Sequence, residues 1–113
     1  ITIPIGGTPI VTGTSGVGTP ATANFSCTIN KAQAVADASG SITVDVWKAA
    51  GAIPNSGNKI SASAPVTLSS SQLNQDSDIS GWDTTVSSGD VFWANVATVD
   101  GSLTSATVQI WCQ

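Results

Sequence analysis

The sequence predicts an all-β fold, an antiparallel β-sandwich of the jelly-roll type, and three observations support this prediction. Apolar and polar residues alternate with a period of two over several short segments. Clusters of Gly, Ser, Asn and Asp separate these segments at the spacing of antiparallel strands. The hydrophobic fraction of 41% in a chain of 113 residues suffices for one core.

The first 24 residues are rich in Gly, Thr and Pro. Proline lacks the N–H that a central strand donates, so it is confined to edge strands and loops. We therefore expect residues 1–24 to form edge strands, or an arm that packs on the domain or on a neighbouring subunit. Residues 25–113 are then the core of the β-sandwich.

Strict alternation is clearest in residues 41–48, where Ile42, Val44 and Val46 share one face and Trp47 lies on the other. The β-branched and aromatic content of residues 90–99 predicts a strand buried on both faces at its centre. The predicted strands of this region are 27–37, 41–48, 90–99 and 106–112.

Turn residues separate these strands. Gly supplies positive φ angles, and Asn, Asp and Ser bond to their own backbone, so clusters of them indicate hairpin and corner turns. Asp100 and Gly101 lie between two strong strands and predict a hairpin, and residues 39–40 predict a turn as well. Residues 69–76 could form a single capped helical turn.

The composition disfavours catalysis. The chain has no His, Arg, Glu, Tyr or Met, and only 9% of its residues are charged. A serine nucleophile needs a general base, which is usually His, and the sequence singles out no pair of carboxylates for a glycosidase. We expect a protein that is not an enzyme and that needs no cofactor.

The charge disfavours two kinds of partner. The net charge is −4, and the three lysines are scattered, so no basic face exists to displace the counterions of a nucleic acid. No apolar run approaches the roughly 20 residues of a membrane-spanning helix. We expect neither nucleic-acid binding nor membrane insertion.

Cys27 and Cys112 are the two cysteines, and both fall in predicted strands. If the strands are neighbours, the two residues can form a disulfide that closes a long loop. The alternative is a pair of small buried thiols.

A calcium site is one interpretation of the segment around Asp76, Asp78 and Ser80. Oxygen ligands at alternate positions, followed by Gly, open the calcium loop of EF-hands, and Asp83 could add another oxygen. However, Ser87 stands where such a loop requires a bidentate Glu. The alternative is that these Asp and Ser side chains cap and bend a loop.

Four tryptophans provide the candidate contacts. The alternation places Trp47 and Trp111 away from the Val and Ile face, where an indole can stack on a sugar ring or anchor an interface. Alternatively, an arm, a second layer or a neighbouring subunit covers them. Trp82 is expected to close an end of the sandwich and Trp93 to lie in the core. Asn55 and Asn58 belong to a loop that could add polar contacts.

The central part of the chain, residues 25–96, resembles a β-sandwich domain found in tailed-phage tail, fibre and other virion structural proteins. The segments that carry the resemblance are 25–31, 36–48, 59–65, 68–70, 75–76, 80–82 and 88–91. The string S-G-S-I-x-V-D-x-W-K and the later G-W and G-D-V are its most specific parts. The resemblance implies a compact sandwich at the distal end of a tail or fibre protein, with no catalytic residues to carry over.

These observations lead to one expected function and two alternatives. We expect a structural or attachment domain on the virion surface, in a tail, fibre or spike protein, which adheres to the host surface or docks to other virion proteins. It would associate with other copies of itself and could bind a host-surface glycan. The alternatives are a carbohydrate-binding module and a capsid decoration protein.

Overall fold

The computed structural model describes residues 1–74, 79–100 and 102–113 and confirms the predicted all-β sandwich. The elements are β1 (Thr2–Gly6), β2 (Ala21–Thr22), β3 (Cys27–Ala50), the 3-10 helix η1 (Ser56–Asn58), β4 (Val66–Asn74), β5 (Thr85–Val86), β6 (Asp90–Val99) and β7 (Ser105–Cys112). Within these described residues, no helix has the length and apolar character needed to cross a bilayer.

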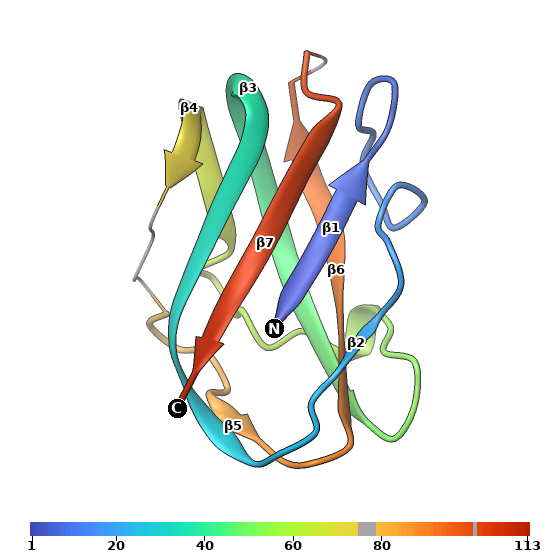
Figure 1. Ribbon diagram of the computed structural model, residues 1–113, viewed down its shortest axis with the longest axis vertical. Helices are drawn as coiled ribbons and strands as arrows, with labels where there is room; N and C mark the ends of the chain where they lie inside the picture. Colours follow the sequence, from blue (N-terminus) through green and yellow to red (C-terminus); the bar gives the residue numbers. More distant parts are fainter. Residues whose placement is uncertain (75–78, 101) are drawn as a thin grey trace.

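The long strand β3 organises the molecule, because it folds back on itself and contributes one arm to each of two layers (Figure 1). Residues 27–36, its first arm, pair with β7, and residues 42–50, its second arm, pair with β6. We call β1, β7 and the first arm the β7 layer, and β2, β6 and the second arm the β6 layer.

The strand β4 joins the two layers along one side. Its start, Val66–Leu68, pairs with the second arm of β3, and its end, Leu73–Asn74, pairs with the first arm. Successive strands therefore alternate between layers, and all the pairings are antiparallel. Such a double-sheet arrangement has the character of a jelly roll.

The fold-back of β3 lies at Gly40, where the register of the β3–β4 pair shifts on both sides. A Cβ atom at Gly40 would lie 2.8 Å from the side chain of Leu103, which is fully buried. Only glycine therefore lets Leu103 pack against the bend. The predicted turn at residues 39–40 exists, but as a sharp bend within one strand.

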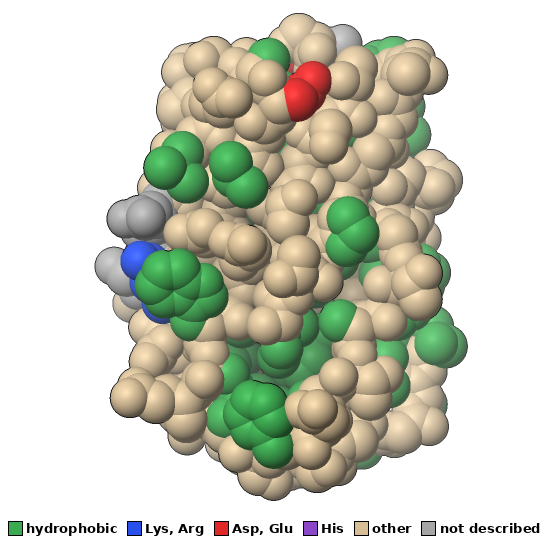
Figure 2. All heavy atoms as spheres, viewed as in Figure 1, with side chains coloured by type: hydrophobic (Ala, Val, Ile, Leu, Met, Phe, Trp, Pro, Cys, Tyr) green, Lys and Arg blue, Asp and Glu red, His purple; other side chains and the backbone are tan. Residues whose placement is uncertain are grey.

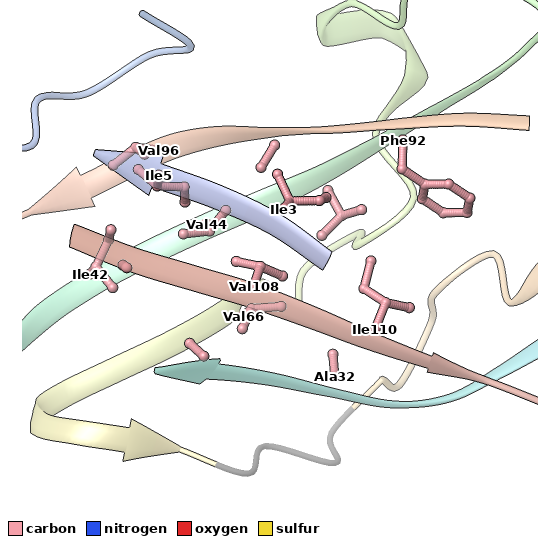
Figure 3. Close-up of a cluster of buried hydrophobic side chains, with 14 of the residues drawn as sticks. Ile3, Ile5, Ala32, Ile42, Val44, Val66, Phe92, Val96, Val108 and Ile110 are labelled. Atoms are coloured by element: carbon pink, nitrogen blue, oxygen red, sulfur yellow. The ribbon is translucent and has the colours of Figure 1, made fainter. Parts of the chain in front are cut away.

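The core lies between the two layers and consists of the side chains that period-two alternation turns inward. Side chains from β1 and β7 in one layer point toward those of β6 and the second arm of β3 in the other (Figure 3). Each large aliphatic or aromatic side chain removed from water stabilises the fold by about 1.5–3 kcal/mol. The largest fully buried side chains are Phe92, Ile3, Ile10, Ile29, Ile42, Leu103, Ile110, Val44, Val46, Val66, Val86 and Val96.

Residues 1–24 belong to the sandwich itself: Ile3, Ile5 and Ile10 are buried in the core. The backbone of residues 16–18 pairs with the outer edge of β1, as Gly6 N donates to Gly16 O at 2.7 Å. Gly13 pairs with Val96 of β6. The segment thus covers the side of the sandwich between the two layers, opposite β4.

Two local predictions are wrong. The strands β6 and β7 do not form a hairpin, because the described residues of β6 pair with β3 and β2, whereas those of β7 pair with β3 and β1. The connection between them crosses from one layer to the other, with Leu103 buried under it. Residues 69–74 continue strand β4 instead of forming a helical turn, since pairing with both arms of β3 overrides the weak helical signal.

Candidate functional site

The two tryptophans predicted to bind are not neighbours, because they lie on the outer faces of different layers. Trp47 is in the second arm of β3, in the β6 layer, and Trp111 is in β7. Strand alternation turns both outward, since their neighbours Val46 and Ile110 are buried. The structure thus offers two separate candidate surfaces.

On the β6 layer, Trp47 lies directly opposite Trp93 of β6, and Lys59 bridges to Trp47 on its other side. One step along the strands, Asp45 lies opposite Asn95. We call these five residues the tryptophan face. Residues directly opposite each other in an antiparallel pair have Cβ atoms about 5 Å apart, so the two indoles are adjacent.

Hydrogen bonds hold part of this face in place. The buried hydroxyl of Ser61 donates to Asp45 Oδ1 at 3.0 Å, and Lys59 Nζ lies 4.0 Å from the same oxygen. The Trp93 indole N–H donates to the carbonyl of Gly18 at 3.1 Å. The carboxylate and one indole are therefore held in place before any ligand arrives.

Other groups of the tryptophan face keep free hydrogen-bonding capacity. Within the part of the chain that the structure describes, the Asn95 amide and the Trp47 indole N–H make no hydrogen bond, and Asp45 Oδ2 accepts none. An indole plane beside an amide, a carboxylate and an ammonium group offers an apolar platform, donors and acceptors together. This combination suits a ligand with apolar C–H faces and hydroxyl groups at its rim.

Trp111 has a different setting. Trp111 is 45% exposed, and the ammonium of Lys31 lies 3.8 Å from the centroid of its ring. A cation over the indole face is attracted by the ring quadrupole. Because Lys31 occupies one ring face, only the other can stack on a partner.

The loop asparagines mainly shape their own turn. Asn55 Oδ1 accepts from Gly57 N and Asn58 Oδ1 accepts from Asn55 N, both at 2.9 Å, which makes a capping box for η1. These oxygens are therefore engaged by backbone N–H groups. The amide NH₂ groups are the parts of Asn55 and Asn58 left for a ligand.

The predicted calcium segment falls largely outside the described residues, since Asp76 and Asp78 lie there. Ser80 is exposed, and Asp83 Oδ2 forms an ion pair with Lys48 Nζ at 3.0 Å. The hydrogen bond from Lys48 is the main cause that lowers the pKa of Asp83. Among residues 1–74, 79–100 and 102–113, no three metal-ligating side chains cluster.

The structure joins Cys27 and Cys112 in a disulfide, with Cα atoms 5.6 Å apart. The bond links the start of β3 to the end of β7, next to the mutual backbone hydrogen bonds of Thr28 and Gln113. In the chain-entropy model, a loop of this length stabilises the fold by about 4–5 kcal/mol. The disulfide holds the C-terminal strand in the β7 layer.

The structure agrees with the prediction for Trp82 but not with the prediction for Trp93. Trp82 is 7% exposed, and its indole N–H donates to the Ala64 carbonyl at 2.7 Å, so it closes the core as expected. The prediction that Trp93 lies in the core is wrong: it points outward, opposite Trp47. Alternation within residues 90–99 could have shown this, because Phe92 and Ala94, on either side of it, are both fully buried.

No family model, curated protein or solved structure matches this chain. No enclosed cavity is found among the described residues either. The virion setting is therefore expected from the sequence alone. The structural arguments about function come from the side chains on the surface.

Proposed function

We propose that this chain is a non-enzymatic attachment domain of a phage virion protein that adheres to the host by binding a surface glycan on its tryptophan face. The observation that supports glycan binding is the outward pair Trp47 and Trp93, flanked by the free groups of Asn95 and Asp45. The virion setting is supported by the sequence resemblance of residues 25–96.

A glycan fits this chemistry better than a nucleic acid does. The C–H face of a pyranose ring can pack on an indole, while its hydroxyls can pair with an amide, a carboxylate and an ammonium group. The face has one lysine, Lys59, balanced by Asp45 at 4.0 Å. It therefore gives no electrostatic advantage to a polyanion.

A shallow, open face of this kind binds a single sugar weakly. Several copies of the domain on one virion would act together, because each further contact is made at a high effective concentration. The attachment function therefore needs only modest affinity from each copy.

The test is binding to a glycan array, followed by titration of the glycan that binds. Trp47→Ala removes the central indole of the tryptophan face and is expected to weaken binding at least about tenfold, a loss of about 1.4 kcal/mol. Trp111→Ala, on the opposite layer, is the matched control. Its affinity for the soluble glycan, measured per site so that association between copies adds nothing, should equal that of the wild type.

Two results would overturn this proposal. One is the absence of any glycan that binds the wild-type domain, and the other is equal affinity in the wild type and the folded Trp47→Ala variant. A loss confined to Trp111→Ala would move the site to the other layer and would also count against it.

The capsid decoration alternative predicts a different abundance. A decoration protein covers the capsid in many copies, whereas a tail or fibre domain is present in few. Quantitative mass spectrometry of intact particles separates the two, and a copy number close to that of the major capsid protein would overturn the tail or fibre placement.

A further inference from the structure

We infer that the outer face of the β7 layer is an interface between two copies of this chain. Four strands each place an apolar side chain on this face, with polar residues between some of them: Pro4 of β1, Val35 of β3, Leu73 of β4 and Trp111 of β7. Leu73 is 52% exposed and Trp111 is 45% exposed, which are high values for such large apolar residues. We call this surface the flat face.

The flat face is almost free of charge. Among its described outward positions, Lys31 is the one charged residue within the face, and its ammonium lies over Trp111. Asp37 lies at the end near the bend, where it accepts hydrogen bonds from Thr104 and Ser105. Figure 2 looks onto this layer and shows apolar side chains separated by uncharged polar surface, with acidic atoms toward one end and basic atoms at one side.

This charge distribution favours a second copy over a charged partner. The chain carries a net charge of −4, and Asp45, Asp83, Asp90 and Asp100 all lie in the other layer or in loops. Two copies that meet by their flat faces therefore keep these carboxylates apart. Depletion of charge and exposure of a large aromatic residue are typical of the centre of a protein interface.

The central polar groups of the flat face are already paired or buried, so covering them costs little. Gln33 Nε2 donates a hydrogen bond to Gln109 Oε1, across neighbouring strands. Gln33 is only 8% exposed, and its Oε1 is buried without a partner among the described residues. A second copy would remove little further water from these amides.

The size of the face matches a stable interface. The molecule measures 36 × 25 × 21 Å, and the β7 layer faces along the shortest axis, so the rectangle that bounds this side is about 900 Å². Standard protein interfaces bury about 800 Å² on each partner. A two-fold dimer that covers most of the flat face therefore reaches the standard size.

The test is the oligomeric state in solution, measured by sedimentation velocity over a wide range of concentrations. The wild type is expected to form dimers. Leu73→Lys and Thr2→Lys place a charge at opposite edges of the flat face, at exposed positions where folding is preserved. Each should raise the dimer dissociation constant by at least about a hundredfold, because two-fold symmetry buries two such charges.

Thr98→Lys is the matched control, since Thr98 is an exposed threonine of β6 in the other layer. It should dimerise like the wild type. A wild type that stays monomeric at every concentration would overturn the inference. Equal dimer dissociation constants for Thr98→Lys and Leu73→Lys would overturn it as well. Titration of the monomeric Leu73→Lys variant with the soluble glycan tests the proposed function separately, because the tryptophan face lies on the opposite side and a soluble glycan gains nothing from association between copies.

Discussion

At the scale of single residues, the groups that a side chain contacts decide its role more than the residue type does. Trp82 is buried in a loop with its N–H on a carbonyl, Trp111 of β7 lies under a lysine, and the other two tryptophans lie side by side on an outer face. The same holds for the lysines. The side chain of Lys59 is 44% exposed, whereas that of Lys48 is only 14% exposed.

The first prediction about stability concerns Lys48. Its Nζ contacts Asp83 Oδ2 at 3.0 Å, Asp90 Oδ2 at 3.9 Å and the Thr85 carbonyl, so it joins β3 to the β5 region and to β6. Lys48→Met keeps most of the stem but leaves Asp90, which is 8% exposed, without its cation. We expect the free energy of unfolding to fall by about 2 kcal/mol, between the values for exposed and buried pairs.

Urea denaturation measures this loss, and Lys59→Met is its matched control. Lys59 is 44% exposed and its pair with Asp45 is longer, at 4.0 Å, so the control should lose less than about 1 kcal/mol. Equal losses in the two variants would contradict the proposed role of Lys48.

At the scale of elements, the bend of β3 determines how the layers are assembled. A glycine at residue 40 and turn residues around it were visible in the sequence, and they predicted a turn. The sequence did not reveal that one strand continues through the bend and serves both layers. That outcome depends on Leu103, which comes from a distant loop and fills the space above Gly40.

Gly40→Ala tests this packing. The new Cβ would lie 2.8 Å from the Leu103 side chain, so we expect a loss of about 1–3 kcal/mol in the free energy of unfolding. The loss should shrink when the same substitution is made in a Leu103→Ala background, because the clash is gone. Additive effects of the two substitutions in a double-mutant cycle would show that the contact between residue 40 and Leu103 does not affect the free energy of unfolding.

At the scale of the whole molecule, three carboxylates connect distant segments and make the fold sensitive to acid. Hydrogen bonds from the Thr104 hydroxyl and the Ser105 N–H lower the pKa of Asp37, which ties β3 to the start of β7. The Ser102 hydroxyl and backbone amides lower the pKa of Asp100, and Lys48 lowers that of Asp83. All three groups are more acidic in the folded chain than in the unfolded one.

The sign of the pH dependence follows from these lowered pKa values. Their contribution to stability is fully present above the unfolded pKa of about 4, and it is lost as the pH falls through the folded values below it. Thermal melting from neutral pH to about pH 2 should therefore show a flat region followed by a decline below about pH 4. Asp37→Asn should reduce that decline, whereas a wild type that becomes more stable on acidification would contradict the prediction.

The pattern of residues along the chain is enough to predict an all-β fold and, for most residues, which side chains face the core. The reason is local: a strand turns successive side chains to opposite faces whatever it pairs with. Alternation alone places Ile42, Val44 and Val46 on one face, and all three are buried in the core.

Which strands are neighbours, and hence which surface residues lie close together, becomes clear only in the folded molecule. Trp47 and Trp111 have equivalent patterns in the sequence but lie on opposite layers, and Trp93, Asn95 and Lys59 join Trp47 through pairings that span up to 50 residues. Strand pairing is set by burial of the whole core and by how the connections cross between layers, and no local pattern encodes either.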